Sequence, residues 1–454
     1  MNRIFAIATV VLLLCLGHPG HAENVAWTEL HRAVQQQSVA DVARLIQQGA
    51  DPSAANLYGV TPLLLACQLG SHPLVEQLLA AGADPNRSIA GGQTPLMTAA
   101  RTGDPRCVEL LIQAGADVDA TERRGQTALM WAAAEGNTAA VDALLHRDAD
   151  WKTKTNQDFT AMLFAAREGH LQTCQRLVDA GADVNQTMAP SNTSGRNPRK
   201  GMTALMLAVE SGHFELALWL VQNGANPNDQ SSGYTPLHAV TWVRKTDRGD
   251  NVEGDPAPRG SGSVNSLQFV ERIVAAGADV NATLKRGPSG RAKLNRKGAT
   301  PFLLAAKTAD LPLIETLLRL GASPTINNVD DCNPLMAAAG IGVVAVGEEA
   351  GTESEVLAVI DRMVQLGLDV NHVDKNGETA MHGAAYRNYP LVVAKLSSLG
   401  AKSSVWNQKN QYGWTPVMIA SGKRPGSFKP SPETIAALNL AMDSEDPSKL
   451  TSAH

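Results

Sequence analysis

Apolar residues come in short clusters that recur with a fixed period in the first half of the chain. A Thr-Pro-Leu or Thr-Ala-Leu triplet begins at Thr61, Thr94, Thr127 and Thr160, so the spacing is 33 residues. A run rich in Leu, Met and Ala follows each triplet, and a second apolar cluster such as Val108-Glu109-Leu110-Leu111 comes later in the unit. Apolar residues three and four positions apart form one face of a helix. The pattern therefore predicts two short helices in each 33-residue unit.

Polar residues and glycines between these clusters predict where each helix begins and ends. A threonine before the first helix can accept a hydrogen bond from its first turn, and a proline at the next position costs no backbone bond there. Glycines are expected to end the first helices because they adopt a left-handed backbone without strain. They are Gly70, Gly103, Gly136, Gly169 and Gly212. A Gly-Ala-Asp triplet ends the second helix in the same way, as at Gly115, and turn residues such as Asp84-Pro85-Asn86 lead to the next unit.

The period and the pattern Thr-Pro-Leu-x-x-Ala … Gly-Ala-Asp-x-Asn resemble the ankyrin repeat, a β-turn followed by two antiparallel helices. The resemblance implies an all-α ankyrin-repeat solenoid of about 11 helix-turn-helix repeats with β-turn fingers. The repeats are expected to begin near residues 28, 61, 94, 127, 160, 203, 235, 300, 333, 379 and 415. The domain is expected to span residues 23–442, before a disordered tail at 443–454. The family's usual histidine in the fourth position is kept at His31, His238 and His382, where we expect a structural hydrogen bond.

The period is broken in the second half of the chain. Extra residues fall in two fingers, 186–200 and 284–297, and in two connections between paired helices, 244–265 and 343–354. Insertions in a repeat array usually map to a functional face, although disorder is the competing interpretation. Thr352 and Glu355 have the spacing of a capping box, which predicts that a helix begins at Glu353.

The N-terminus predicts export. Arg3 precedes a thirteen-residue apolar run, Ile4 to Leu16, and Gly20-His21-Ala22 offers a small residue for cleavage. The run is shorter than the roughly 20 residues that a bilayer span requires. We therefore expect residues 1–22 to be a signal peptide and the mature protein to be periplasmic or secreted, with an uncleaved anchor as the alternative.

Composition and motifs argue against several functional classes. A net charge of −5 disfavours a general nucleic-acid binder. Outside the signal, Cys67, Cys107, Cys174 and Cys332 fall in different repeats, so we expect buried free thiols and no disulfide framework or metal site. The segment Gly340-Ile341-Gly342 is similar to a dinucleotide turn, but its third glycine is misplaced, and we expect Gly342 to end a helix. No cofactor, metal or catalytic residue is expected.

Candidate binding residues come from the aromatic and the basic positions. The ankyrin register places five aromatic side chains on the expected concave face, where they could anchor a partner or pack on a finger. They are Phe159, Tyr234, Trp242, Tyr386 and Trp414. The two inserted fingers are basic and contain no acidic residue, whereas the insertion 343–354 is acidic. The basic residues are Arg196, Arg199 and Lys200 in one finger and Lys285, Arg286, Arg291, Lys293, Arg296 and Lys297 in the other.

These features favour an exported, non-enzymatic scaffold that binds another protein through its concave face. We expect the main site over repeats six to nine, in a groove with basic fingers on one side and longer loops on the other. The partner is expected to be a protein with an extended acidic segment, or an envelope polyanion, and not a nucleic acid. No membrane span is expected in the mature chain. Two alternatives remain: an ankyrin effector directed to a host cell, and an enzyme whose active site lies in the inserted loops of repeats seven to nine.

Overall fold

Paired helices account for nearly all regular structure in the chain. The computed structural model describes residues 27–191, 200–246, 252, 256–287, 293–424 and 429–445. Within these residues the chain forms helices and no strands, which confirms the all-α repeat prediction. The predicted signal peptide, residues 1–22, lies outside the described residues, as does the tail beyond residue 445.

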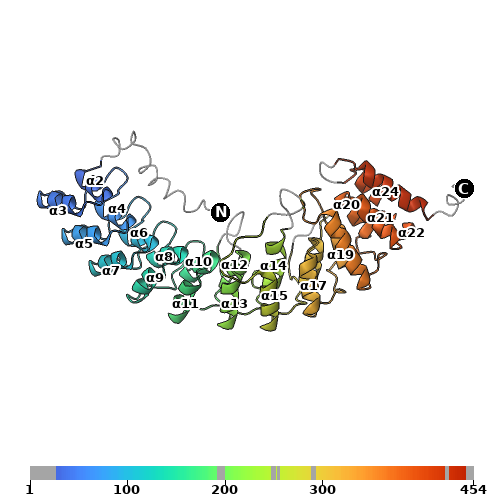
Figure 1. Ribbon diagram of the computed structural model, residues 1–454, viewed down its shortest axis with the longest axis horizontal. Helices are drawn as coiled ribbons and strands as arrows, with labels where there is room; N and C mark the ends of the chain where they lie inside the picture. Colours follow the sequence, from blue (N-terminus) through green and yellow to red (C-terminus); the bar gives the residue numbers. More distant parts are fainter. Residues whose placement is uncertain are drawn as a thin grey trace. The chain divides into compact units, whose positions relative to one another are not determined.

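The chain divides into two compact units, which we call unit 1 and unit 2. Unit 1 comprises residues 1–183 and 188–198, and unit 2 comprises residues 184–187 and 199–454. The helices of unit 1 are α2 (Glu29–Gln35), α3 (Val39–Gln47), α4 (Pro62–Gln68), α5 (His72–Ala80), α6 (Pro95–Thr102), α7 (Pro105–Gln113), α8 (Ala128–Glu135), α9 (Thr138–Leu145), α10 (Ala161–Glu168) and α11 (Leu171–Asp179). Within unit 1 each helix pair packs on the pairs before and after it (Figure 1).

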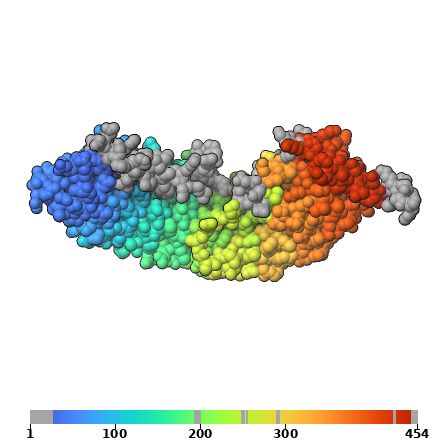
Figure 2. Space-filling model, turned by 45° about the horizontal axis from the view of Figure 1, so that its top comes forward, coloured from blue at the N-terminus to red at the C-terminus, as the bar shows by residue number. Residues whose placement is uncertain are grey.

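Unit 2 contains repeats six to eleven and three of the four long insertions, whereas most of the finger 186–200 belongs to unit 1. Its helices are α12 (Ala204–Glu210), α13 (Phe214–Gln222), α14 (Pro236–Arg244), α15 (Ser266–Ala275), α16 (Pro301–Lys307), α17 (Leu311–Arg319), α18 (Pro334–Ala339), α19 (Glu353–Gln365), α20 (Ala380–Arg387), α21 (Pro390–Ser398), α22 (Ser403–Trp406), α23 (Pro416–Ala420) and α24 (Pro432–Asp443). The repeats of unit 2 also follow one another in sequence order, as the successive colours in Figure 2 show.

Every first helix begins directly after the residue that the sequence pattern marks. In repeat three, the Thr94 side chain accepts a hydrogen bond from the Met97 N–H at 3.2 Å, and Pro95 occupies the first turn. Asn333 does the same for Met336 at 2.9 Å. The eleven N-caps are Thr28, Thr61, Thr94, Thr127, Thr160, Thr203, Thr235, Thr300, Asn333, Thr379 and Thr415.

Helix ends follow the glycine pattern with one correction. Gly115, which follows the end of α7, has a φ of +90°, where a side chain would strain the backbone. In repeat nine the prediction that Gly342 ends the helix is wrong, because α18 ends at Ala339 and Gly340 is its cap, with a φ of +127°. Gly342 lies in the following connection, where it packs against the Leu294 backbone so closely that a Cβ could not fit.

Polar side chains tie consecutive repeats together at the fingers. The ring of His238 accepts a hydrogen bond from the Thr235 N–H at 3.2 Å on Nδ1 and donates from Nε2 to the Ala299 carbonyl at 3.1 Å. Burial lowers the pKa of His238 to about 4, so the ring is neutral and suited to this double role. Turn asparagines make a second link: Asn86 donates to the Gly115 carbonyl at 2.9 Å. The predicted structural role of the repeat histidines is therefore confirmed at His238.

The insertions occur where the period predicts them. Residues 245–265 connect α14 with α15, and residues 340–352 connect α18 with α19. We call residues 340–352 the inserted segment. The predicted capping box at Thr352 is confirmed, with Glu355 bonding back to the Thr352 N–H at 2.8 Å. The small extension before repeat eleven forms the short helix α22, which carries the buried side chain of Trp406.

The four cysteines outside the predicted signal are buried free thiols, as predicted. Burial raises the pKa of Cys107 and Cys174 to about 12, which keeps both as neutral thiols at ordinary pH.

Over the described residues, none of the helices combines the length and the hydrophobicity that a bilayer crossing demands.

Candidate protein-binding face and its buried charge cluster

The residue before each cap and the residues seven to nine positions after it lie together in space. Tyr234 precedes its cap and stacks edge-on against Trp242, seven positions after the cap, with ring centroids 5.0 Å apart. Glu378 precedes its cap and accepts a 2.7 Å hydrogen bond from Tyr386, again seven positions after the cap. These positions correspond to the concave face expected from the sequence. We call the surface they form in each unit the inner face.

In unit 1 the inner face carries arginines stacked on aromatic rings. The Arg101 guanidinium lies 5.4 Å from the centre of the Trp131 ring. Arg167 lies 5.2 Å from both Phe159 and Phe164. The aromatic rings are buried while both arginines stay partly exposed, so the cations form the outer layer of this face. Phe159, predicted as an anchor, is covered and would meet a partner only through Arg167.

Two of the predicted aromatic anchors lie together in unit 2. Tyr234 is mostly buried and donates a 2.7 Å hydrogen bond to Glu210, whereas the Trp242 side chain remains partly exposed. Tyr234 therefore supports Trp242, and Trp242 is the ring of this pair that a partner can reach.

The last two predicted anchors are buried more deeply. Tyr386 is 0% exposed, so its prediction as a surface anchor is wrong. Its hydroxyl is held by Glu378, and the Arg424 guanidinium lies 5.3 Å above its ring. Trp414 is 9% exposed, and its backbone N–H bonds to the Asn410 side chain. Packing on a finger, the alternative left open by the sequence, accounts for both residues, because Asn410 of the finger before repeat eleven bonds to each of them.

The basic finger 284–297 divides into an exposed set and one inward residue. Lys285, Arg286, Lys293 and Lys297 are exposed. Arg296, also predicted to bind a partner, is partly buried and interacts electrostatically with Glu349, so it does not belong to the exposed set. The Arg286 side chain lies beside Gly233, next to Tyr234. Lys200 is exposed in the other finger, and Arg196, Arg199 and Arg291 lie outside the described residues.

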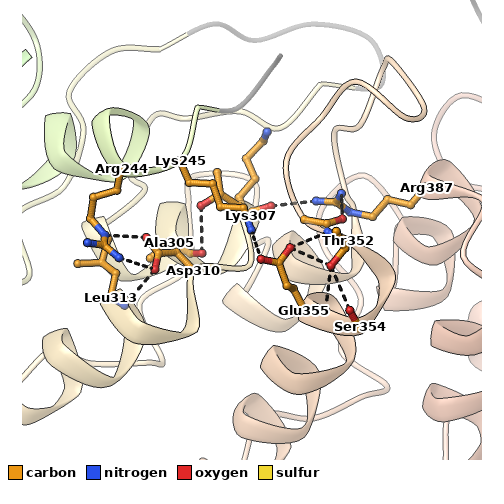
Figure 3. Close-up of polar contacts among 12 residues, drawn as sticks. Arg244, Lys245, Ala305, Lys307, Asp310, Leu313, Thr352, Ser354, Glu355 and Arg387 are labelled. Atoms are coloured by element: carbon orange, nitrogen blue, oxygen red, sulfur yellow. Dashed lines mark hydrogen bonds and ion pairs between the residues drawn. The ribbon is translucent and has the colours of Figure 1, made fainter. Parts of the chain in front are cut away.

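A cluster of ion pairs joins repeats seven to ten inside unit 2 (Figure 3). Arg244 forms a bidentate ion pair with Asp310, with N–O distances of 2.8 and 3.1 Å. Asp310 also accepts a hydrogen bond from the Leu313 N–H and so caps α17. Lys245 donates to Glu355 of the α19 capping box at 2.7 Å. These pairs connect residues far apart in sequence at the base of both inserted connections.

Lys307 and Arg387 are the deepest cations of the cluster, being 6% and 3% exposed. Arg387 donates to the Gly351 carbonyl at 3.2 Å and reaches across to the Lys307 carbonyl at 2.9 Å, as Figure 3 shows. Burial lowers the pKa of Lys307 to about 8, and Glu349 partly offsets this by favouring the charged form. Cations so deeply buried need a carboxylate nearby.

Glu349 of the inserted segment supplies that carboxylate. It is 3% exposed, and its Oε2 accepts a hydrogen bond from Lys307 Nζ at 3.4 Å. Its Oε1 accepts from the backbone N–H groups of Val344 and Ala345 at 2.7 and 3.3 Å. The segment therefore folds around its own glutamate and presents that glutamate to the inner face.

A protonatable carboxyl lies beside the cluster. Glu378 accepts hydrogen bonds from Tyr386 and from Asn410, at 2.7 and 2.9 Å. Burial raises the pKa of Glu378 to about 7, and the nearby Asp374 adds to the rise. This group changes charge close to neutral pH inside the last repeats.

The predicted open groove between finger and loop is absent at repeats eight and nine. Gly342 packs directly on Leu294 of the finger, and Arg296 faces Glu349, so finger and inserted segment meet. Antiparallel helix pairs predict fingers and inter-helix connections on opposite edges, but residue spacing gives no direction for a long insertion between the helices. The sequence did contain one signal for this contact. The inserted segment is acidic, and repeat eight has a lysine, Lys307, at the seventh position after its cap.

The described residues contain no group of three or more His, Cys, Asp or Glu arranged to hold a metal ion.

The family model for ankyrin repeats, in three copies, matches residues 7–89, 30–122, 63–155, 96–188 and 187–246. Together these matches cover residues 7–246, more than half of the chain. Comparison with curated proteins gave no significant match.

Proposed function

The chain belongs to the ankyrin-repeat family, and from this premise we propose that it is an exported scaffold that binds another protein and performs no catalysis. Ankyrin repeats are protein-interaction modules, which supports the binding role. Export rests on the sequence of residues 1–22 alone. We propose that the binding site lies on unit 2 at repeats six to eight, and that the partner presents an extended acidic segment.

The observation that carries this site is the exposed basic finger beside a reachable tryptophan. Lys285, Arg286, Lys293 and Lys297 are exposed, and Arg286 lies against the turn that leads to Tyr234 and thus to Trp242. Clustered exposed cations attract an acidic partner over a distance and raise the association rate. A partly buried tryptophan supplies the contact area that slows dissociation.

The test is capture and kinetics with the chain from residue 23 onward. Partners captured from envelope extracts are identified, and binding is measured for wild type and for a variant with all four finger cations changed to serine. We expect slower association for this variant, with the difference shrinking near 1 M salt, where screening acts within about 3 Å. Trp242→Ala is expected to speed dissociation instead.

The matched control removes four exposed cations from unit 1, by serine substitution of Arg32, Arg87, Arg123 and Lys152. It changes the net charge equally, and we expect it to leave association within about twofold of wild type. Equal slowing in both variants would show that net charge alone acts, and wild-type kinetics in the finger and Trp242 variants would refute the proposed site. Export is tested separately, since native protein that still begins at Met1 would contradict it.

A further inference from the structure

The inserted segment covers side chains that a regular repeat leaves at the surface. Lys307 and Arg387 stand seven and eight positions after their caps, the positions that Arg101 and Glu135 hold in unit 1. Arg101 is partly exposed and Glu135 is exposed, whereas Lys307 and Arg387 are buried. The inserted segment thus occupies an inner face that would otherwise be open.

Four cations interact with the charge of the glutamate of this segment, and one of them, Lys307, donates a hydrogen bond to it. They come from one finger, two first helices and the turn after α23, and each interacts electrostatically with Glu349. They are Arg296, Lys307, Arg387 and Arg424. Because residues of repeats eight, ten and eleven contribute to one carboxylate position, stacking of the repeats forms this position and the insertion fills it.

The remaining bonds that hold the segment go to its backbone. Tyr389 donates to the Gly351 carbonyl at 2.7 Å, beside the bond from Arg387 to the same oxygen. Arg424 donates to the Val343 carbonyl at 3.4 Å. Backbone carbonyls are present in any peptide, so Glu349 is the side chain through which the segment is recognised electrostatically. Within the described residues, the buried Arg387 Nε makes no hydrogen bond and stays available as a donor.

The end of the inserted segment caps the following helix without using Glu349. Helix α19 is capped by its own Thr352 and Glu355. Gly340 and Gly351, at the ends of the segment, have φ values of +127° and +109°, which glycine adopts without the strain that a side chain would cause. Release exposes the buried side chains of Ile341 and Val343, which a bound peptide would have to cover.

We propose that Arg296, Lys307, Arg387 and Arg424 form a carboxylate-binding site for an Asp or Glu side chain of the partner, and that Glu349 of the inserted segment occupies this site as an internal ligand until the partner displaces it. This inference rests on the proposed protein-binding function and names the side-chain chemistry that the inner face of repeats eight to eleven selects. The internal ligand is tethered at both ends and so competes at a high effective concentration. An acidic partner segment must therefore gain additional contacts, which the adjacent basic finger can supply.

The test uses a hexaglutamate peptide as the probe and hexaglutamine as the neutral control. All proteins carry serine at Lys285, Arg286, Lys293 and Lys297, so that binding to the exposed finger does not contribute. We expect Glu349→Ala to bind hexaglutamate at least tenfold more tightly than its parent, because the competing carboxylate is gone. The control Glu348→Ala removes an exposed glutamate from the same segment and should stay within about twofold of the parent.

Equal affinities of Glu349→Ala and Glu348→Ala would overturn the proposal and leave Glu349 a purely structural residue. Should Glu349→Ala fail to fold, Glu349→Gln keeps an acceptor for Val344 and Ala345 and should still gain at least threefold. Hydrogen exchange of the unmutated chain adds an independent measure: hexaglutamate, but not hexaglutamine, should speed exchange of amides 341–351. Unchanged exchange together with no gain for Glu349→Gln contradicts the inference.

The two proposals fail in different ways. If no partner protein is captured but Glu349→Ala gains affinity for hexaglutamate, the carboxylate site stands and the scaffold function is wrong. If a partner is captured and its affinity is the same for wild type and Glu349→Ala, the scaffold function stands and the partner does not use this site.

Discussion

Units 1 and 2 are built from the same repeat, but the cationic side chains at the ends of their first helices differ in exposure and in bonding partners. In unit 1, Arg101 and Arg167 lie over aromatic rings and keep part of each guanidinium in water. In unit 2, Lys307 and Arg387 at equivalent positions are buried and bonded to carbonyl groups and to Glu349. A cation stacked on a ring remains solvated, whereas a buried cation needs a complete set of partners.

The difference teaches that a repeat position has no fixed environment of its own. Lys307 would be an ordinary partly exposed residue if repeat nine had the regular length. The inserted segment in that repeat converts Lys307 into a buried ion-pair residue 42 positions away from Glu349. The surroundings of the inner face in unit 2 are therefore set by the folding of the insertion, whereas those in unit 1 are set by neighbouring repeats.

The largest expected effect contrasts Arg387 with Arg101. Arg387→Met should lower the free energy of unfolding by about 3 kcal/mol, because the Lys307 and Gly351 carbonyls each lose a hydrogen bond and Glu349 loses a nearby cation. Arg101→Met should cost less than about 1 kcal/mol, since it removes one partly exposed stacking contact. Urea unfolding followed by circular dichroism measures both, and equal costs would remove the distinction between the two faces.

The next effect is a pH dependence that belongs to unit 2. The folded pKa of Glu378, about 7, lies above its ordinary value of 4.5, so the folded state favours the protonated form. The associated stability is fully present below pH 4.5 and is lost as pH rises through 7, by at most about 3 kcal/mol. Glu378→Gln keeps the acceptor for Tyr386 and should remove this loss. The difference in unfolding free energy between variant and wild type, measured from pH 4.5 to 8, should therefore grow with pH, and a flat difference would contradict the assignment.

A smaller effect should be the same in both units. Gly115→Val in unit 1 and Gly321→Val in unit 2 each place a β-branched residue at a φ near +90°, with no atom within 4 Å of the new Cβ. Each should cost about 1–2 kcal/mol through backbone strain alone. Thermal unfolding of the two variants, with alanine at the same positions as controls, checks this. A cost below about 1 kcal/mol would count against the repeat register.

The smallest effect concerns the thiols. Reducing agent should leave the Tm unchanged, because Cys67, Cys107, Cys174 and Cys332 form no disulfide that constrains the unfolded chain. Thiol reagents should label all four only after denaturation, since each is buried. A marked fall in Tm under reduction would show that a disulfide forms in the native protein.

Local rules written in the sequence determined the repeat architecture. Each cap at Thr61, Thr94 or Thr300 is satisfied within three residues, and each stop such as Gly115 is a property of one backbone position. Interactions this local do not depend on the rest of the chain, so the eleven helix starts, the positions of the insertions and the capping box at Thr352 could be predicted.

The aromatic and basic candidates show that local rules do not predict the burial of a side chain or its neighbours. The register correctly placed Tyr386 at the inner face and Arg296 in a finger. It could not show that Glu378 and Arg424 enclose Tyr386 or that Arg296 interacts with Glu349. Burial of a side chain is set by everything that packs over it, including segments tens of residues away. Sequence position alone carries no such information.

The sequence by itself determined that this protein is an ankyrin array with insertions in repeats six to nine, because capping and helix termination act over a few residues. Only the tertiary structure decided that the inserted segment returns to the inner face and places Glu349 among Arg296, Lys307, Arg387 and Arg424. The physical reason is that the path of a long connection is fixed by non-local contacts, here buried ion pairs and carbonyl bonds that exist only once the repeats have stacked.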